Sequence, residues 1–345
     1  MNKLNTHDLF IDEEALKNLK LVAVAYSHVD REDYATKGAY EAELEVEDRS
    51  EEVMAEVAKL GIAVKGYAGN QYFLTNILVD KPDLVLNLVD TLQGKEALQP
   101  AIPGALELSK IPYTGAGMRG LVIGNDRHMF KQMLLAHDIP TPDYKFIRDM
   151  RSKIPESLGL PLIVKLNESG GSVGIDNKAV KETMVSVQKK VATMLDTYKI
   201  PVIVEKFVSG PEITAVVYDD GHKKHVFLGQ KNFKIKPDGK YEFTSLESYD
   251  DLKAYTYSIA DQAIQDKINP LAARAFEMLG YRDYAKFDIR FEEATSTPYF
   301  IDCNPNTALG PDMGLPMTEV LDLHGVSFTL LIKSLLSKHA KSLKK

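Results

Sequence analysis

The chain has 345 residues, which predicts two or three domains rather than one. Hydrophobic residues make up 44% and charged residues 26%, as in an ordinary soluble globular protein, and no run of about 18 apolar residues predicts a membrane span. The formal charge of −7 argues against bulk attraction to nucleic acid or an anionic membrane. A single cysteine, Cys303, excludes an internal disulfide, and the polar N-terminus does not read as a signal peptide, so a cytoplasmic protein is expected.

The first third of the chain alternates β-like and helical patterns. A short apolar strand is expected from Leu21 (LVAVAYS). Residues 50–67 follow as a helical pattern, in which Val53, Val57 and Leu60 share one face and Gly61 is placed to cap the C-terminus. Residues 81–90 predict a second buried strand and residues 94–115 a further helix and turn. This alternation predicts a parallel-sheet α/β domain over about residues 20–118.

The remainder of the chain predicts a mixture of strands and helices. We expect a helix over 126–139, a strand over 139–147, and apolar β runs within 161–175 and 201–220. Further strands are predicted at 225–230, 285–291 and 298–302, and helices at about 262–279 and 318–338. The segment 230–260, rich in Lys, Tyr, Ser and Asp, predicts a mobile surface loop followed by the start of a helix.

Oxygen-bearing side chains recur on the strands predicted near the C-terminus. Alternation along a strand puts Lys286, Asp288 and Arg290 on one face, and Asp302 and Asn304 on one face of the next strand. If the two strands pair as a hairpin, three oxygen ligands meet beside two cations. Such a set suits Mg²⁺, which takes one or two carboxylates together with substrate phosphate oxygens. The alternative is a polar hairpin face with ordinary ion pairs.

Two segments upstream carry chemistry suited to a nucleotide. The stretch 165-KLNESGGSVGI-175 follows an apolar strand with a lysine and three glycines, so that its backbone can approach an anion, although an ordinary glycine-rich hairpin turn has the same composition. The stretch 202-VIVEKFVSGPE-212 has an extended pattern, with Glu205 at the end of an apolar strand and Glu212 seven residues later. Extended backbone can hydrogen-bond to the edge of an adenine, and a carboxylate can accept hydrogen bonds from ribose hydroxyls. The alternative is that these are ordinary glutamates of a surface loop, which are common.

Taken in order, the lysine, the glycine-rich loop, VEKFVSGPE and the D-x(13)-D-x-N spacing resemble the ATP-grasp superfamily. More narrowly, LIVKLNESGGSVGI and VEKFVSGPEIT look like the D-alanine–D-alanine ligase branch, and the resemblance covers about residues 80–320. It implies an α/β protein with the ATP-grasp fold. The implied domains are an N-terminal parallel-sheet α/β domain (1–118), a central lid-like α+β domain (119–204) and a C-terminal α+β domain with metal and catalytic residues (205–345).

The resemblance also implies the roles of individual residues. Binding of ATP is implied for a set comprising Arg127, Lys165, Gly170, Gly171, Ser172, Val173, Gly174, Glu205, Lys206, Phe207, Val208, Glu212 and Ile301. Asp288, Asp302 and Asn304 are the implied ligands of two Mg²⁺ ions, with Mn²⁺ as a possible substitute. Lys286, Ser172 and Arg290 are the implied catalytic residues. The glycine-rich loop and the segment 230–250 are candidate lids over the phosphates.

The chain departs from the branch at several positions. Asp302 stands where glutamate is usual, Arg127 where a helix lysine is usual, and Lys286 where an arginine steadies the oxyanion. Met313 aligns near a serine that reads a substrate carboxylate. The glutamate–serine signature for the first amino acid is absent from 25-AYSHVDREDY-34, and 242-EFTSLESYDD-251 lacks the run expected of the mobile loop. The ATP machinery is therefore predicted to be kept and amino-acid selection to be changed.

The resemblance implies an ATP- and Mg²⁺-dependent carboxylate–amine ligase that acts through an acyl phosphate and releases ADP and phosphate. The expected product is a dipeptide or amino-acid conjugate. The alternatives are a true D-alanine–D-alanine ligase and a non-catalytic nucleotide-binding protein of the same fold; no lysine- or biotin-specific signature supports phosphorylation or carboxylation. The expected partners are a small carboxylate and an amine, with no nucleic acid and no membrane, and a homodimer is expected from the resemblance. Tyr26, His28 and Asp33 are candidates to line the substrate pocket, although ordinary loop chemistry also accounts for them.

Overall fold

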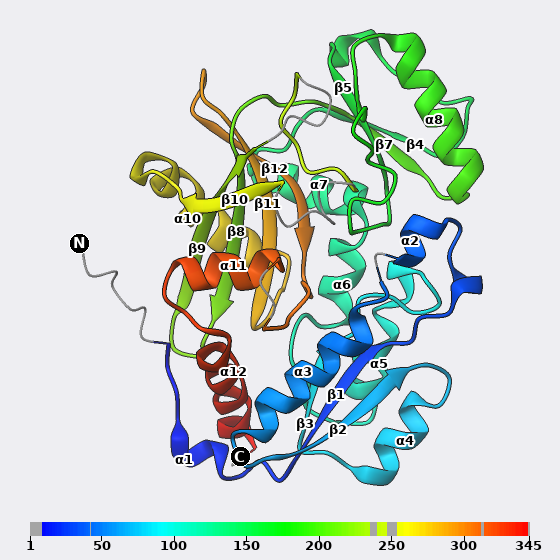
Figure 1. The fold of residues 1–345 in the computed structure, drawn as a ribbon. Coiled ribbons are helices and arrows are strands. Elements are labelled where there is room, and N and C mark those ends of the chain that lie inside the picture. Colours follow the sequence, from blue (N-terminus) through cyan, green and yellow to red (C-terminus); the bar gives the residue numbers. More distant parts are fainter. Residues whose placement is uncertain (1–8, 42, 235–239, 247–253, 312–313, 344–345) are drawn as a thin grey trace.

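The computed structural model describes residues 9–41, 43–234, 240–246, 254–311 and 314–343. Three β-sheets are present in these residues, and each forms the centre of one lobe (Figure 1). Apart from α-helices, the described residues include short 3-10 helices at Arg31–Asp33, Glu96–Leu98 and Glu156–Leu158. The fold is of the α/β class that the sequence predicts, with one parallel and two antiparallel sheets.

The N-terminal sheet has the strand order β2-β1-β3 and is parallel. Its strands are β1 (Leu21–Ser27), β2 (Ala63–Gly69) and β3 (Leu84–Leu88). The strand β3 is buried along its whole length, because a parallel strand covered on both faces needs a continuous apolar run. The accompanying helices are α1 (Glu13–Leu16), α2 (Lys37–Glu41), α3 (Val46–Ala58), α4 (Phe73–Asp80) and α5 (Ala101–Leu108).

The central sheet is antiparallel, with the order β4-β7-β5-β6. Its strands are β4 (Tyr144–Ile147), β5 (Leu162–Leu166), β6 (Val180–Lys181) and β7 (Val202–Lys206). Helix α8 (Met184–Tyr198) packs against β5, β6 and β7 and starts at Thr183, whose side chain accepts from Ser186 N–H. Most apolar side chains of this lobe form one cluster drawn from residues 147–204, whereas Ile163 and Val180 pack in another with Phe207 and Phe243.

The C-terminal sheet is antiparallel, with the order β10-β9-β8-β11-β12. Its strands are β8 (Glu212–Asp219), β9 (Lys224–Phe233), β10 (Tyr255–Ile259), β11 (Tyr284–Glu292) and β12 (Thr297–Asn304). One of its two apolar clusters includes side chains of α6 (Met118–Gly124), α7 (Arg127–Ala136) and α10 (Gln262–Met278). The other includes α11 (Pro316–Leu323), α12 (Phe328–Ser342), α1, α3 and the N-terminal sheet, so two lobes share one core.

Three predicted segments differ from the structure. Residues 63–69 form the separate strand β2, which lies at a sheet edge with half-exposed residues and so lacks a buried run. Residues 255–259, predicted as a loop, form the edge strand β10. The single helix predicted over 318–338 is two helices, because Gly325 takes φ 79° and Ser327 caps a new helix.

None of the described helices alone is long and apolar enough to cross a membrane. Only α11 and α12 taken together have that length and composition, and they are bent by 101° at the break between them.

Candidate active site

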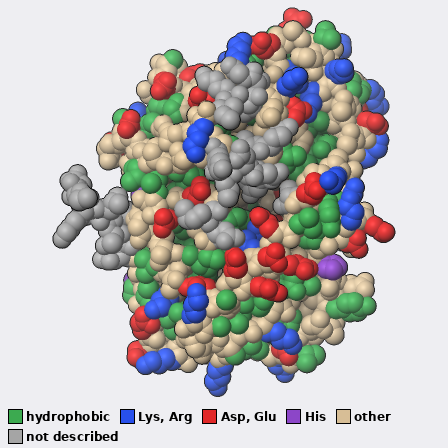
Figure 2. All heavy atoms as spheres, viewed as in Figure 1, with side chains coloured by type: hydrophobic (Ala, Val, Ile, Leu, Met, Phe, Trp, Pro, Cys, Tyr) green, Lys and Arg blue, Asp and Glu red, His purple; other side chains and the backbone are tan. Residues whose placement is uncertain are grey.

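A single cleft brings side chains from the three lobes together. Its lining includes most of the residues predicted to bind ATP or metal: Arg127, Lys165, Gly170, Gly171, Ser172, Glu205, Phe207, Val208, Glu212, Lys286, Asp288, Arg290, Ile301, Asp302 and Asn304. Val173, Gly174 and Lys206 are not among the lining residues, and the side chain of Lys206 is exposed. Acidic side chains gather across the middle of the face drawn in Figure 2.

The predicted hairpin is present. Strands β11 and β12 pair antiparallel with Asp288 opposite Asp302 and Lys286 opposite Asn304, and a bulge follows Asp288. Lys286 Nζ donates to Asp288 Oδ2 at 2.6 Å. The other oxygen, Asp288 Oδ1, is buried and has no hydrogen-bond donor among the described residues. A buried carboxylate oxygen without a donor is costly by itself and suits a cation as its partner.

Asp302 pairs with Arg127, the first residue of α7. Arg127 Nε donates to Asp302 Oδ2 at 3.1 Å, and Nη2 donates to the same oxygen. The backbone N–H of Cys303 donates to Asp302 Oδ1 at 3.0 Å. Burial alone would raise the pKa of Asp302, but Arg127 and Lys165 hold it below its ordinary value, so the group is an anion facing the cleft.

Two carboxylates and an amide therefore meet at one end of the β11–β12 hairpin. Among the described residues no group of three His, Cys, Asp or Glu side chains forms a self-sufficient metal site. The donor set of Asp288, Asp302 and Asn304 instead fits an ion such as Mg²⁺ that takes its remaining oxygens from water and phosphate. The unpartnered Asp288 Oδ1 supports the same fit.

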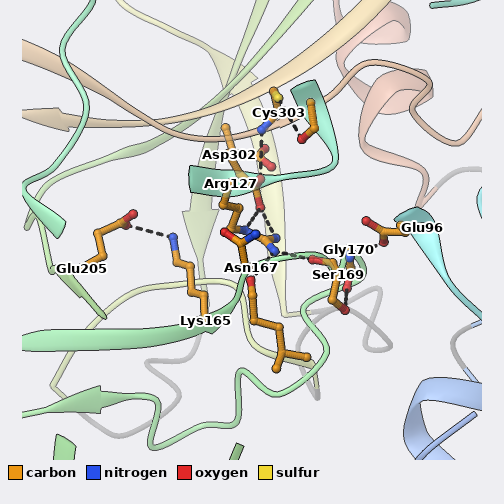
Figure 3. A network of polar contacts seen from close by, with 12 residues as sticks. Glu96, Arg127, Lys165, Asn167, Ser169, Gly170, Glu205, Asp302 and Cys303 are labelled. Atoms are coloured by element: carbon orange, nitrogen blue, oxygen red, sulfur yellow. Dashed lines mark hydrogen bonds and ion pairs between the residues drawn. The ribbon is translucent and has the colours of Figure 1, made fainter. Parts of the chain in front are cut away.

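The glycine-rich loop faces the hairpin across the cleft (Figure 3). Arg127 Nη1 donates to the carbonyl oxygens of Leu166, at 2.8 Å, and Ser169. Gly170 N–H donates to the carboxylate of Glu96, which belongs to the N-terminal lobe. Gly171 takes φ 56°, a left-handed conformation that favours glycine. The loop is thus attached both to the start of α7 and to the N-terminal lobe.

Glu205, predicted to bind adenine, lies in a buried cluster of charges. It is paired with Lys165 Nζ of β5 at 3.0 Å and with Lys131 Nζ of α7 at 2.6 Å. Burial would raise the pKa of Glu205, but the two lysines lower it below the ordinary value. Sequence reasoning missed Lys131; the signal was its place four residues after Arg127, on the same helix face.

Glu212 lies in a second such cluster. Lys231 Nζ donates to Glu212 Oε1 at 2.8 Å and Thr244 Oγ1 donates to the same atom at 2.7 Å. Burial opposes ionisation, but Lys231 and Arg290 lower the pKa of Glu212 to about 2. Arg290 also donates to the carbonyl oxygens of Gly210 and Glu242, so its guanidinium ties the predicted adenine-binding segment to residues 240–246.

The N-terminal wall of the cleft is acidic, and its residues were not predicted. Glu43, Glu45, Asp90 and Glu96 line it together with Arg49, which pairs with Asp90. Burial raises the pKa of Glu96 to about 7, against the opposing effect of Arg127. The predicted candidates Tyr26, His28 and Asp33 are not among the lining residues. The acids come instead from the segment before α3 and from residues after β3, outside the predicted stretch 25–34.

Three predicted features fall wholly or partly outside the described residues. They are Met313, residues 247–251 of the segment 242–251, and residues 235–239 and 247–250 of the candidate lid 230–250. Within the described part of the segment 242–251, Phe243 and Thr244 line the cleft.

Comparisons with known proteins agree with this arrangement. A family model described as D-ala D-ala ligase C-terminus matches residues 133–337, more than half of the chain. A D-alanine–D-alanine ligase of Polaromonas sp. (strain JS666) is 29% identical over 66% of this chain and 67% of its own length. One from Janthinobacterium sp. (strain Marseille) is 27% identical over 77% and 82%.

Solved structures show the same fold. The D-alanine–D-alanine ligase of Bacillus anthracis complexed with ATP superposes with a TM-score of 0.71 and 18% identity, over 94% of this chain and 99% of that one. The VanG D-Ala:D-Ser ligase of Enterococcus faecalis gives a TM-score of 0.68 and 15% identity, over 93% and 99%. The chain belongs to the D-alanine–D-alanine ligase family of ATP-grasp proteins.

Proposed function

We propose that the protein joins a carboxylate and an amine into an amide at the expense of ATP, with an amino acid on at least one side. A carboxylate takes the terminal phosphoryl group of ATP, giving an acyl phosphate and ADP. The amine then attacks the acyl carbon, loses a proton and displaces phosphate. The observation that carries the proposal is the hairpin of Asp288, Asp302 and Asn304, which lines one cleft with Arg127, Lys165 and the glycine-rich loop.

The nucleotide is proposed to lie along the cationic part of the cleft. Lys165, held by Glu205, and Arg127 supply positive charge along the phosphates, and the loop N–H groups supply donors. Phe207 and Val208 form an apolar wall for adenine, and Glu212 accepts from ribose hydroxyls. Lys286 lies beside Asp288 and stabilises the negative charge that develops on the acyl oxygen when the amine attacks.

Asp288, Asp302 and Asn304 are proposed to hold two Mg²⁺ ions, which Mn²⁺ can replace. When bound, the ions neutralise charge on the phosphates that would otherwise repel an incoming carboxylate. The acidic N-terminal wall, with Glu43 and Asp90, provides acceptors for a substrate ammonium group. We further propose that the protein is a homodimer and acts in the cytoplasm.

The test is phosphate release from ATP with a panel of amino acids supplied singly and in pairs, D-alanine included. We expect one pair to raise phosphate release at least tenfold over ATP alone, with one ADP and one amide formed per phosphate. Asp302→Ala is the control, since it removes a proposed metal carboxylate and should abolish the stimulated release. No stimulation by any pair, with nucleotide still bound, would instead favour a non-catalytic nucleotide-binding protein.

A further inference from the structure

Arg127 contacts two elements that belong to different lobes. Its Nε and Nη2 donate to Asp302 Oδ2 on β12, while Nη1 donates to the carbonyl oxygens of Leu166 and Ser169, which flank the start of the glycine-rich loop. The side chain is buried, with 8% of its surface exposed. Figure 3 shows the guanidinium between Asp302 on one side and Ser169 on the other.

The chemistry of the guanidinium makes these contacts dependent on one another. The group is planar and rigid and presents its N–H donors in fixed directions, so a movement of Asp302 moves the donors that hold Leu166 and Ser169. A lysine offers three donors from one nitrogen and cannot reach both sets of acceptors from opposite sides. Hydrogen bonds to a charged group contribute more than neutral ones, so the link is stiff.

The other attachments of this loop do not involve Asp302. The backbone N–H of Arg127 donates to Asn167 O at 3.0 Å, and that of His128 donates to Asn167 Oδ1 at 2.9 Å. Gly170 N–H donates to Glu96. These bonds fix Asn167 to α7 and Gly170 to the N-terminal lobe. Ser169 lies between these two anchored residues, and Arg127 connects it to the hairpin.

We propose that Arg127 is a positioning residue that couples Asp302 to the glycine-rich loop, so that a change at this carboxylate is transmitted to the loop. The assignment of Asp302 as a metal ligand rests on the proposed function, whereas the link itself exists in the ligand-free chain. It follows that occupancy of Asp302 by a cation, which competes with the guanidinium, repositions the loop over the phosphates. Such coupling is reciprocal, so loop closure also changes affinity at Asp302.

The experiment is amide hydrogen exchange in the ligand-free protein, resolved to residues 167–175. Asp302→Asn keeps the shape of the side chain and removes its charge; Arg127→Lys keeps the charge and removes the fork. Each is expected to speed exchange at Val173 and Ile175, whose N–H groups bond within the loop, about tenfold, which corresponds to about 1.4 kcal/mol. The double variant should be no faster than the faster single one, because both changes break the same link.

Matched controls separate this link from a general loosening of the cleft. Asp288→Asn removes the other proposed metal carboxylate, which pairs with Lys286 and not with Arg127, and should leave loop exchange unchanged. Arg119→Lys, on the exposed face of α6, should also have no effect. The amide of Asn167, bonded to Pro201 O at 2.9 Å, should keep its rate in every variant.

The proposal is overturned if Asp302→Asn leaves the loop unchanged, if Asp288→Asn has the same effect, or if the two single effects add in the double variant. Should Arg127→Lys not fold, the comparison of Asp302→Asn with Asp288→Asn decides alone. Because no ligand is used, a failure of amide formation in the substrate panel would count against the proposed function and leave this result standing.

Discussion

At the scale of single residues, the cleft is built from buried charged side chains, and each buried carboxylate is grouped with cationic side chains. Glu205 shares its two oxygens between Lys131 and Lys165, and Glu212 lies between Lys231 and Arg290. A buried charge without a partner costs several kcal/mol, so such groups persist only as complete sets. The cluster around Glu205 therefore stabilises the fold and also sets the charge that a nucleotide would meet.

Replacing Lys131 by methionine should test the first of these effects, the contribution of the cluster to the stability of the fold. The side chain is fully buried, and its loss leaves Glu205 with Lys165 as its remaining lysine partner. We expect a loss of about 2 kcal/mol in the free energy of unfolding, because one buried oxygen of Glu205 loses its partner while Lys165 still balances the charge, measured by urea denaturation. Lys189→Met, on the exposed face of α8, is the control and should change stability by less than about 0.5 kcal/mol. Equal stabilities of the two variants would contradict the pairing.

Glu212 predicts a dependence of stability on pH. Its pKa is about 2 in the folded chain, below an ordinary value of 4.5, so the folded state binds fewer protons than the unfolded state. Its contribution is fully present above pH 4.5 and is lost as the pH falls towards 2. Glu212→Gln should therefore be less stable than the parent by roughly 3 kcal/mol at pH 7, and the difference should shrink between pH 4.5 and 2. A difference independent of pH would contradict this expectation.

At the scale of elements, two neighbouring positions of the glycine-rich loop favour glycine for different reasons. A Cβ at Gly170 would lie 2.5 Å from Glu96 Oε1, whereas one at Gly171 meets no atom within 4 Å but sits at φ 56°. Gly170→Ala must push aside the Glu96 carboxylate that accepts from the Gly170 N–H, and Gly171→Ala adds local strain of about 1 kcal/mol.

We therefore expect Gly170→Ala to weaken binding of a non-hydrolysable ATP analogue at least tenfold, by calorimetry. Gly171→Ala should weaken it less than fivefold. Combining Gly170→Ala with Glu96→Ala should recover part of the loss, because the carboxylate that the new methyl group meets is gone. If the combined variant is no better than Gly170→Ala alone, contact with Glu96 is not the reason for glycine at 170.

Most elements could be predicted from the sequence where a local signal agrees with burial. Helix α7 has an N-cap at Asp126, which accepts from Met129 N–H, and the β11–β12 hairpin follows from alternation of Lys286, Asp288 and Arg290. The edge strands β2 and β10 have weaker signals, because half-exposed strands need no apolar run. Glu96 was missed because its partner Gly170 is distant in the chain and no local pattern reports such a contact. Lys131 shares a helix face with Arg127, but its partner Glu205 is equally distant in the chain.

At the scale of the whole molecule, Asp283 joins parts of the chain that are far apart in sequence. It accepts from the Gly115 N–H at 2.8 Å and pairs with Lys338 at 3.0 Å and His339 at 2.9 Å, both on α12. Burial opposes its ionisation, but His339 and Lys338 hold the pKa of Asp283 far below its ordinary value. The carboxylate therefore links the N-terminal lobe to the last helix.

Asp283→Asn should lower the free energy of unfolding by about 3 kcal/mol and do so for both lobes together. The measurement is native-state hydrogen exchange at increasing denaturant. Strands β1 and β3 and helix α12 should lose protection at one common free energy, because they share a core. Loss of protection in the N-terminal strands at lower denaturant than in α12 would show that the two lobes unfold separately.

The shared core has a consequence for how ligands enter and leave. Two of the three lobes share the core around α12 and cannot separate without exposing apolar surface. The β4–β7 lobe has its own main cluster, while Ile163 and Val180 of its strands pack with Phe207 and Phe243. That lobe joins the others through the chain segments 137–143 and 207–211. We therefore expect the β4–β7 lobe, with Lys165 on β5 and Glu205 on β7, to move against the other two lobes when a ligand enters the cleft.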